Sequence, residues 1–73
     1  MAEEKEYISK VGKNIRKLRL ENKIRQLDLA DACDFDKQTL YNIEMGKVNL
    51  TLKSLLKISK ALKVPIKNLV DFD

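Results

Sequence analysis

The chain has 73 residues, of which 44% are apolar and 36% charged, and its formal net charge is +4. A chain of this length buries only about 60% of the surface that it exposes when unfolded, so we expect one small domain with little room for a catalytic cleft. One cysteine, Cys33, and no histidine exclude disulfides, zinc sites and imidazole acid–base chemistry. The composition therefore predicts a protein that is not an enzyme and that carries no metal and no cofactor.

We expect no targeting signal at the start of the chain. The first residues, Met-Ala-Glu-Glu-Lys-Glu, lack the apolar region of a signal peptide. No later run approaches the roughly 20 apolar residues that span a bilayer. We expect a cytoplasmic protein with a reduced Cys33, which is more typical of a small buried side chain than of a reactive thiol.

Charge is unevenly distributed along the chain. Residues 10–25 carry seven basic side chains against Glu21 alone, and residues 53–67 carry five lysines and no acid. The acidic patch between these segments consists of Asp28, Asp31, Asp34 and Asp36. This segregation suggests a polyanionic partner that particular segments contact. The alternative is a surface of solvated lysines that keeps the protein soluble.

Apolar residues recur with helical periodicity, and no segment alternates as a strand would. The pattern predicts an all-α, compact bundle of five short helices. A lead-in that frays, residues 1–6, should precede helices over about 7–21, 26–33, 37–45, 52–62 and 66–70. In the fourth helix the expected inner face consists of Leu52, Leu55, Leu56, Ile58 and Leu62.

Several residues mark helix ends and contacts. We expect Asn22 to end the first helix in a left-handed conformation and Gly46 to end the third. Asp36 and Thr51 are placed as N-caps of the third and fourth helices. Pro65 breaks the chain before the fifth helix. Gly12, inside the first helix, indicates close packing against a neighbour.

The third predicted helix has one face that a core does not need. Leu40 and Ile43 point one way, whereas the opposite face carries Lys37, Gln38, Tyr41, Asn42 and Met45. In the major groove Gln or Asn can pair with adenine N6 and N7, and Lys can donate to guanine O6 and N7. The same residue types are also ordinary on a solvent-exposed face, so the pattern by itself leaves DNA contact open.

The chain resembles the Cro/repressor-type (XRE) helix-turn-helix domain, a lambda-repressor-like fold, across about residues 8–70. The resemblance is carried by Val11–Arg19, Gln26, Leu29-Ala30, Asp36–Leu40, Ile43–Lys47 and Leu55–Val64. It implies a sequence-specific DNA-binding transcriptional regulator with a helix-turn-helix over about 26–45, whose recognition helix, about 37–45, lies in the major groove. Double-stranded operator DNA is the implied partner, in a bacterial or phage-like cytoplasm and on the nucleoid when bound.

The resemblance also assigns roles to particular residues. It implies base contacts from Lys37, Gln38, Tyr41 and Asn42, although Tyr41, like Thr39, should lie near sugar or phosphate. The phosphate contacts that it implies come from Gln26, Arg16, Arg25, Thr39 and Lys47. It further implies a structural ion pair between Arg19 and Glu44 that ties the first helix to the third.

Four positions depart from the family pattern. Arg25 stands where Ser or Thr usually caps the second helix, Lys23 and Asp34 stand where glycines are common, and Leu50 replaces a usual proline. Arg25 cannot accept a capping hydrogen bond, although its guanidinium could meet a phosphate. Asp34 tolerates a left-handed backbone better than most residues do. These departures affect local stability more than the fold.

A homodimer on a two-fold operator is the leading hypothesis, because one small module offers few contacts. Its dimer surface would consist of Ile66, Leu69, Val70 and Phe72, unless these side chains instead close the core against Tyr7 and Ile8. The alternative function is a protein-binding adaptor or antitoxin-like module of the same fold; a peptide on a membrane surface fits poorly. We expect no membrane partner and no small-molecule ligand. The sequence leaves open which operator is bound and whether transcription is repressed or activated. It also leaves open the biological setting, which could be a prophage, restriction–modification control, a toxin–antitoxin pair or a chromosomal regulator.

Overall fold

The computed structural model describes residues 2–71, with side chains from residue 3 onward. Five helices follow one another along these residues: α1 (Ala2–Glu21), α2 (Gln26–Ala32), α3 (Lys37–Glu44), α4 (Leu52–Leu62) and α5 (Ile66–Val70). They contain no strand, so the predicted all-α bundle is confirmed for the described part of the chain. None of these helices is both long enough and apolar enough to cross a membrane.

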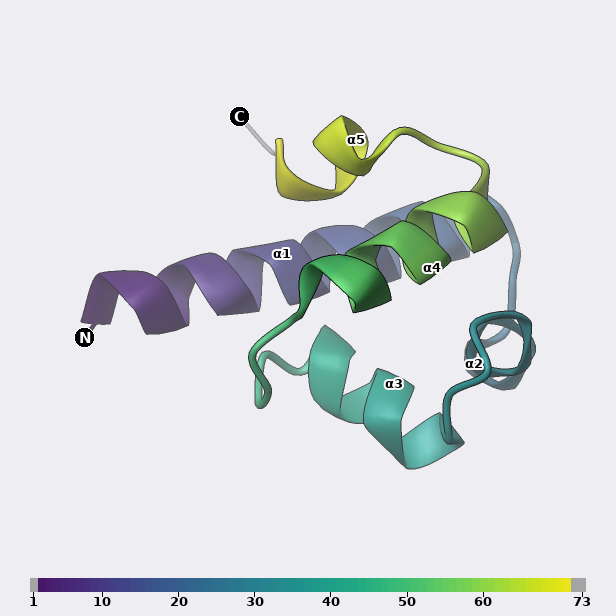
Figure 1. The fold of residues 1–73 in the computed structure, drawn as a ribbon, viewed down its shortest axis with the longest axis horizontal. Coiled ribbons are helices and arrows are strands. Elements are labelled where there is room, and N and C mark those ends of the chain that lie inside the picture. The colour runs from purple at the N-terminus through teal and green to yellow at the C-terminus, as the bar shows by residue number, and fades with distance from the viewer. Residues whose placement is uncertain (1, 72–73) are drawn as a thin grey trace.

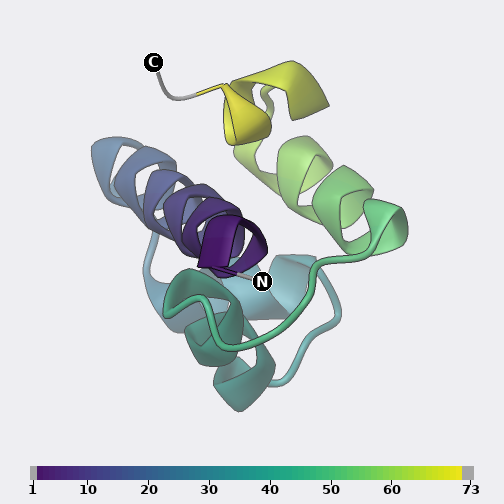
Figure 2. The same ribbon diagram turned by 90° about the vertical axis from the view of Figure 1, so that its left-hand side faces the viewer.

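The long helix α1 runs through the middle of the molecule. In two views at right angles, α2 and α3 lie on one side of α1 and α5 lies on the opposite side, with α4 alongside (Figures 1 and 2). Most of the side chains that meet between these helices are apolar, and several have no exposed surface at all. The buried core consists of Val11, Ile15, Leu29, Ala30, Cys33, Leu40, Ile43, Ile58, Leu62 and Leu69.

The N-terminal part of α1 differs from the expectation. Residues 2–6 are helical rather than frayed; Met1 lies outside the described residues. Two causes are visible in the sequence. Glu3 and Glu4 occupy the first turn, where carboxylates complement the positive end of the helix dipole. The remaining residues of this segment, Ala2, Lys5 and Glu6, are good helix formers. As a result α1 projects beyond the rest of the bundle at its N-terminal end (Figure 1).

Helices α1 to α4 end in the same way. One or two residues after each helix the backbone adopts a left-handed conformation, at Lys23 (φ 57°), Asp34 (φ 58°), Gly46 (φ 71°) and Lys63 (φ 59°). At each end the next residue donates its N–H to a carbonyl five positions back, as Ile24 does to Arg19 at 3.1 Å. This is the Schellman arrangement, which satisfies the last carbonyls of a helix. The prediction for Gly46 is confirmed, and Asp34 adopts a conformation that it tolerates better than most residues do.

The prediction for Asn22 is wrong by one residue. Lys23 takes the left-handed conformation, while Asn22 Nδ2 donates to the carbonyl of Leu18 at 2.7 Å. The Asn22 side chain thus satisfies a terminal carbonyl from within the last turn. This leaves Lys23 to reverse the chain direction.

The two predicted N-caps behave differently. Thr51 Oγ1 accepts from the backbone N–H of Ser54 at 3.1 Å, as expected. Asp36 occupies the N-cap position of α3 with an extended backbone, but its side chain makes no capping hydrogen bond, so that part of the prediction is wrong. The start of α3 instead relies on Phe35, which packs against the core before the helix, and on Leu40, which is wholly buried within it.

Helix α4 also corrects one expectation. Ile58 and Leu62 are buried and Leu55 packs against the core, as predicted. Leu52 and Leu56, however, are 67% and 44% exposed, because they lie on the side of α4 that no other helix covers. The helix therefore presents apolar side chains to solvent as well as to the core.

Candidate nucleic-acid interface

The unit of α2 and α3 is held by a short turn and a shared core. Asp34, in its left-handed conformation, reverses the chain after Cys33, and Phe35 then turns inward with its ring 5.6 Å from Lys57 Nζ. Cys33 is buried as predicted; burial raises the pKa of its thiol, although the nearby Lys57 acts in the opposite direction. The thiol therefore stays protonated and packs as a small apolar group.

One face of α3 is open to solvent. Lys37, Gln38 and Thr39 are exposed, Tyr41 is 40% exposed, and Asn42 is partly exposed. Gln38 Nε2 donates to Asn42 Oδ1 at 3.1 Å across one helical turn. Gln38 Oε1 and Asn42 Nδ2 remain available to a ligand, so the pair presents both an acceptor and donors. This is the chemistry that reads base edges in a major groove.

Tyr41 stands beside a lysine that follows the helix. Lys47 Nζ lies 5.5 Å from the centroid of the Tyr41 ring, within the range of a cation–π contact. The ammonium is therefore positioned at the C-terminal edge of the open face of α3. An ammonium there would lie near a phosphate if α3 lay in a groove.

The inner side of the same helix carries a buried ion pair. Arg19 Nε donates to Glu44 Oε2 at 2.7 Å and Arg19 Nη2 donates to Glu44 Oε1 at 3.1 Å, with side-chain exposures of 8% and 2%. Arg19 Nη1 also donates to the Ile24 carbonyl at 2.9 Å. The pair that the resemblance implied is thus present, and it joins α1 to α3 and to the connector before α2.

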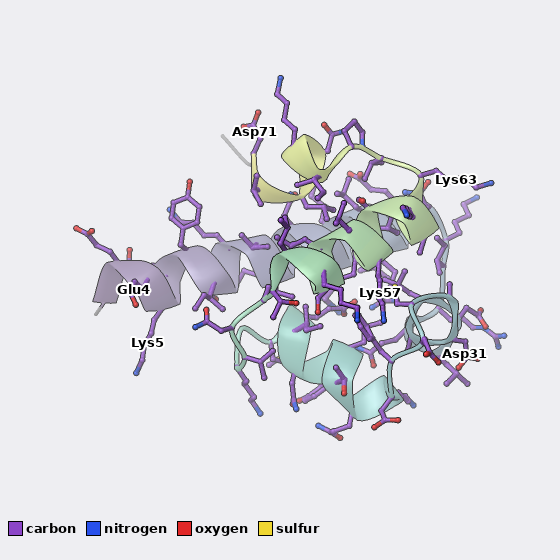
Figure 3. All side chains as sticks on the ribbon, viewed as in Figure 1. Glu4, Lys5, Asp31, Lys57, Lys63 and Asp71 are labelled. Carbon is purple, nitrogen blue, oxygen red and sulfur yellow. The ribbon has the colours of Figure 1, made fainter. Side chains whose placement is uncertain are left out.

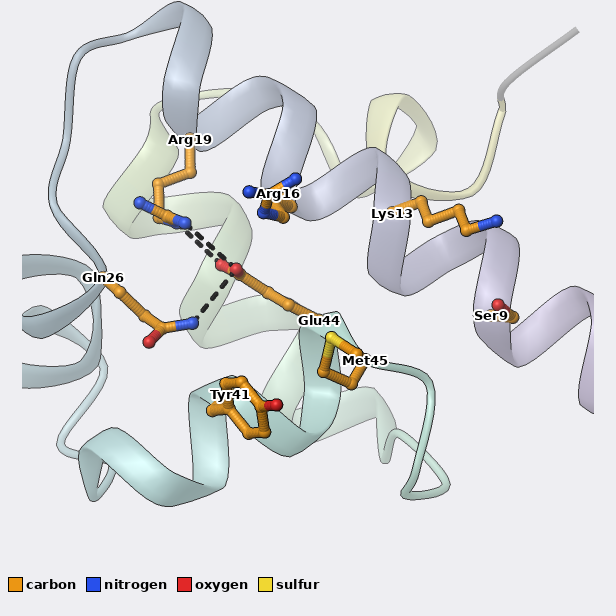
Figure 4. Close-up of a pocket in the computed structure, with 8 residues that line it drawn as sticks. All are labelled: Ser9, Lys13, Arg16, Arg19, Gln26, Tyr41, Glu44 and Met45. Atoms are coloured by element: carbon orange, nitrogen blue, oxygen red, sulfur yellow. Dashed lines mark hydrogen bonds and ion pairs between the residues drawn. The ribbon is translucent and has the colours of Figure 1, made fainter.

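Gln26 belongs to this network as well. Its Nε2 donates to Glu44 Oε1 at 3.2 Å, so one carboxylate orders side chains from α1 and α2 together (Figure 4). Sequence reasoning assigned Gln26 to phosphate and Glu44 to Arg19, but it missed the bond between Gln26 and Glu44. Nothing in the spacing of positions 26 and 44 could have revealed this contact, because it depends on how α2 and α3 pack.

A hollow of about 540 Å³ opens over this network between α1 and α3. Figure 4 shows Arg16 and Lys13 extending from α1 along one wall, with Tyr41 of α3 and Met45, directly after α3, on the other. Arg16 is exposed, and its charge has no carboxylate partner among the described residues. The hollow is therefore lined by free positive charge on the side of α1 that faces α3.

Arg25, the last of the predicted phosphate residues, is exposed before α2 and makes no capping hydrogen bond. Its Nε donates to Asp28 Oδ2 at 2.9 Å, and this hydrogen bond, together with the charge of Asp28, raises the pKa of the guanidinium. Arg25 and Gln26 thus stand together at the start of α2. To bind a phosphate, Arg25 would have to give up at least one of its hydrogen bonds to Asp28.

The predicted dimer surface is only partly available. Leu69 is wholly buried in the core, so its inclusion in that surface is wrong. Asn14 of α1 explains why: its Nδ2 donates to the carbonyls of Asn68 and Leu69 at 2.8 and 2.9 Å and draws α5 onto α1. Ile66 is half-buried and Val70 is 36% exposed. Phe72 lies outside the described residues.

Comparison with known proteins identifies the family. A family model described as helix-turn-helix matches residues 15–69. The control protein C.BamHI from Bacillus amyloliquefaciens is 40% identical over 62 residues, which cover 84% of this chain and 76% of that protein.

Solved structures agree with this assignment. The restriction-modification controller protein C.AhdI from Aeromonas hydrophila has a TM-score of 0.83 at 29% identity, covering 85% of this chain and 94% of that one. The restriction-modification controller protein C.Esp1396I has a TM-score of 0.76 at 37% identity, covering 92% and 96%. The chain belongs to the helix-turn-helix family of DNA-binding transcription regulators.

Proposed function

We propose that this DNA-binding regulator acts as a homodimer that places α3 of each protomer in the major groove of a two-fold-related operator. The observation that carries the proposal is the division of α3 into two faces. The inner face is held to α1 by the buried Arg19–Glu44 pair, whereas the outer face presents the hydrogen-bonded amides of Gln38 and Asn42. A rigid helix with an open face of paired donors and acceptors suits readout of base edges.

Base contacts in this proposal come from the open face of α3. Gln38 Oε1 can accept from adenine N6–H, and the second hydrogen on Nε2 can donate to N7. Asn42 Nδ2 is free to donate to an acceptor such as guanine O6 or thymine O4, since Asn42 Oδ1 already accepts from Gln38. Lys37 and Tyr41 flank this pair.

Phosphate contacts come from the surrounding elements: Arg16, Arg25, Gln26, Thr39 and Lys47. Gln26 combines two roles, because Glu44 orients its side-chain amide while the residue stands at the N-terminus of α2. Contacts of this kind fix the register of the protein on the duplex and make affinity depend on salt.

We place the regulator in the control of restriction–modification genes, acting from the cytoplasm of a bacterial cell and on the nucleoid when bound. The support comes from its relatives. A control protein from Bacillus amyloliquefaciens and two proteins described as restriction-modification controllers are 29% to 40% identical to this chain over the aligned residues. In this proposal the 73 residues act as one domain.

Selection of bound sites from random duplex DNA tests the proposal. We expect a consensus with two-fold symmetry and half-sites about one helical turn apart. The Gln38→Ala and Asn42→Ala variants should each lose preference at particular positions of each half-site. If the wild-type protein enriched no consensus, sequence-specific binding would be wrong, and a protein-binding role for this fold would take its place.

A further inference from the structure

The N-terminal turns of α1 are not used by the function proposed above. They project past α3 and run beside the loop between α3 and α4, residues 45–51 (Figures 1 and 2). A shallow pocket of about 440 Å³ lies between the two segments. The residues that line it are Lys5, Ile8, Gly46, Lys47, Val48 and Asn49. Among these described residues there is no carboxylate.

The helical register of α1 directs Lys5 toward this pocket. With about 100° per residue, Lys5, Ser9, Gly12 and Arg16 fall within roughly 60° of one another. Gly12 lies against the backbone of α3, and Ser9 lies against Gly46. Lys5 is one turn beyond Ser9 on the same stripe, and Figure 3 shows its side chain extending toward the side of the molecule that carries α3.

The neighbouring acids of α1 point elsewhere. Glu4 and Glu6 are each about 100° away from Lys5 around the helix, and Glu3 is about 160° away. Figure 3 shows Glu4 and Lys5 leaving the helix in different directions. The positive charge of Lys5 is therefore not neutralised on the face that meets the loop.

The loop supplies further donors. Within residues 2–71 the backbone N–H groups of Val48 and Asn49 donate to no protein acceptor. Val48 is 37% exposed, and Asn49 and Lys47 are exposed as well. The residues that line this open pocket thus carry two ammonium groups, two free backbone amides and one side-chain amide. Donors of this kind, without an acceptor acid, suit an oxyanion such as a phosphate.

We propose that Lys5, Lys47 and the amides of Val48 and Asn49 form a second phosphate-binding site, which holds a DNA backbone phosphate beyond the C-terminal end of α3. This proposal rests on the proposed function and extends the stretch of DNA backbone that the protein contacts. A backbone phosphate fits better than a free one because the pocket is open and continuous with the reading face: Lys47 also stacks over Tyr41. A single exposed phosphate site gains little alone, whereas contacts along one duplex act together.

The test compares two lysines of α1. Lys5→Gln removes the charge that faces the pocket, and Lys10→Gln removes an exposed charge about 140° away around the same helix. Binding to a mixed-sequence duplex and to the selected consensus is measured over a series of salt concentrations. For Lys5→Gln we expect the slope of log affinity against log salt to fall by about 0.9 per protomer, equally for both duplexes. Lys5→Arg should retain the wild-type slope.

Several results would overturn the inference. Wild-type slopes for Lys5→Gln, or equal losses for Lys5→Gln and Lys10→Gln, would show that the pocket holds no backbone phosphate. A saturable response of the Asn49 amide resonance to inorganic phosphate, with an unchanged DNA slope, would assign the pocket to a free anion instead. Both outcomes leave the proposed function intact if the wild-type protein still selects a consensus that depends on Gln38. An unchanged melting temperature for Lys5→Gln excludes loss of folding as the cause.

Discussion

The two faces of α3 differ in burial: the inner face is packed and hydrogen-bonded inside the protein, whereas the outer face is open to solvent. On the inner face, the carboxylate of Glu44 is 2% exposed and accepts from two partners, and the carbonyls of Ile43 and Glu44 lie against Gly12. On the outer face, Gln38 and Asn42 contact each other and solvent. The inner face fixes where the helix lies, and the outer face leaves its chemistry free to vary. A regulator built this way can change its operator without changing its fold.

Both glycines of the chain lie in the seam between α1 and α3. A Cβ on Gly12 would overlap the carbonyl oxygen of Ile43. A Cβ on Gly46 would lie 2.8 Å from Ser9 Cα, and its φ of 71° is already strained for other residues. Elsewhere Lys23, Asp34 and Lys63 take the same left-handed conformation without being glycine. At Gly46 the backbone of Ser9 in α1 also leaves no room for a Cβ.

Removal of the buried acid should have the largest effect on stability. Glu44→Leu leaves the guanidinium of Arg19 buried without its partner, and we expect a loss of about 3–5 kcal/mol in the free energy of unfolding. Urea titration followed by circular dichroism measures it. The double variant Arg19→Met/Glu44→Leu should recover most of this loss, since no charge is then left unpaired. Equal losses in the single and double variants would indicate that packing, not the unpaired charge, is the cause.

Gly12→Ala should have the next largest effect. Alanine favours the helix by about 1 kcal/mol over glycine, but overpacking against a backbone carbonyl costs about 1–3 kcal/mol. We expect a net loss of up to about 2 kcal/mol in the free energy of unfolding, measured by the same titration. Lys17→Ala, at an exposed position of the same helix, is the control and should change stability by less than about 0.5 kcal/mol. A stabilised Gly12→Ala variant would mean that α3 can move away from α1 at little cost.

Much of the fold was predictable from the sequence because apolar periodicity and turn residues agree with each other. The ranges of α2, α4 and α5, the left-handed Gly46 and the capping Thr51 all follow from local patterns. Other features depend on distant parts of the chain. Lys23 and Lys63 carry no local signal for a left-handed backbone, and the contact between Gln26 and Glu44 arises only when α2 and α3 pack.

The candidate site was predictable to a lesser degree. The polar face of α3 follows from its register, but its assignment to DNA required resemblance to a family. Leu69 could not be separated from Val70 by pattern alone, because a five-residue helix is too short for a reliable apolar period. The hydrogen bonds from Asn14 to α5 decide which of the two is buried.

Besides the buried ion pair and the packing at Gly12, self-association would contribute to stability, and this contribution would depend on protein concentration. A homodimer should melt at higher temperature as protein concentration rises, because the partner binds the folded state. Val70→Glu would place a charge in the proposed interface at the α5 end; we expect dimer affinity to fall by about tenfold, or about 1.4 kcal/mol. Sedimentation measures this change. Leu56→Glu, on the exposed side of α4, is the comparison variant. Dissociation by Leu56→Glu instead of Val70→Glu would move the interface to α4.

The smallest change in stability should accompany the largest loss of recognition. Gln38→Ala and Asn42→Ala remove exposed or partly exposed side chains, so each should change the free energy of unfolding by less than about 0.5 kcal/mol. Each should nonetheless weaken operator binding by about 1–3 kcal/mol. Because Gln38 donates to Asn42, the double variant should lose less than the sum of the two, and titrations with operator DNA measure this coupling. Lys67→Ala on α5 should leave both stability and operator binding unchanged. If the two α3 variants bound the operator like the wild type, the open face of α3 would not be the surface that reads DNA, and its separation from the buried seam would have no functional meaning.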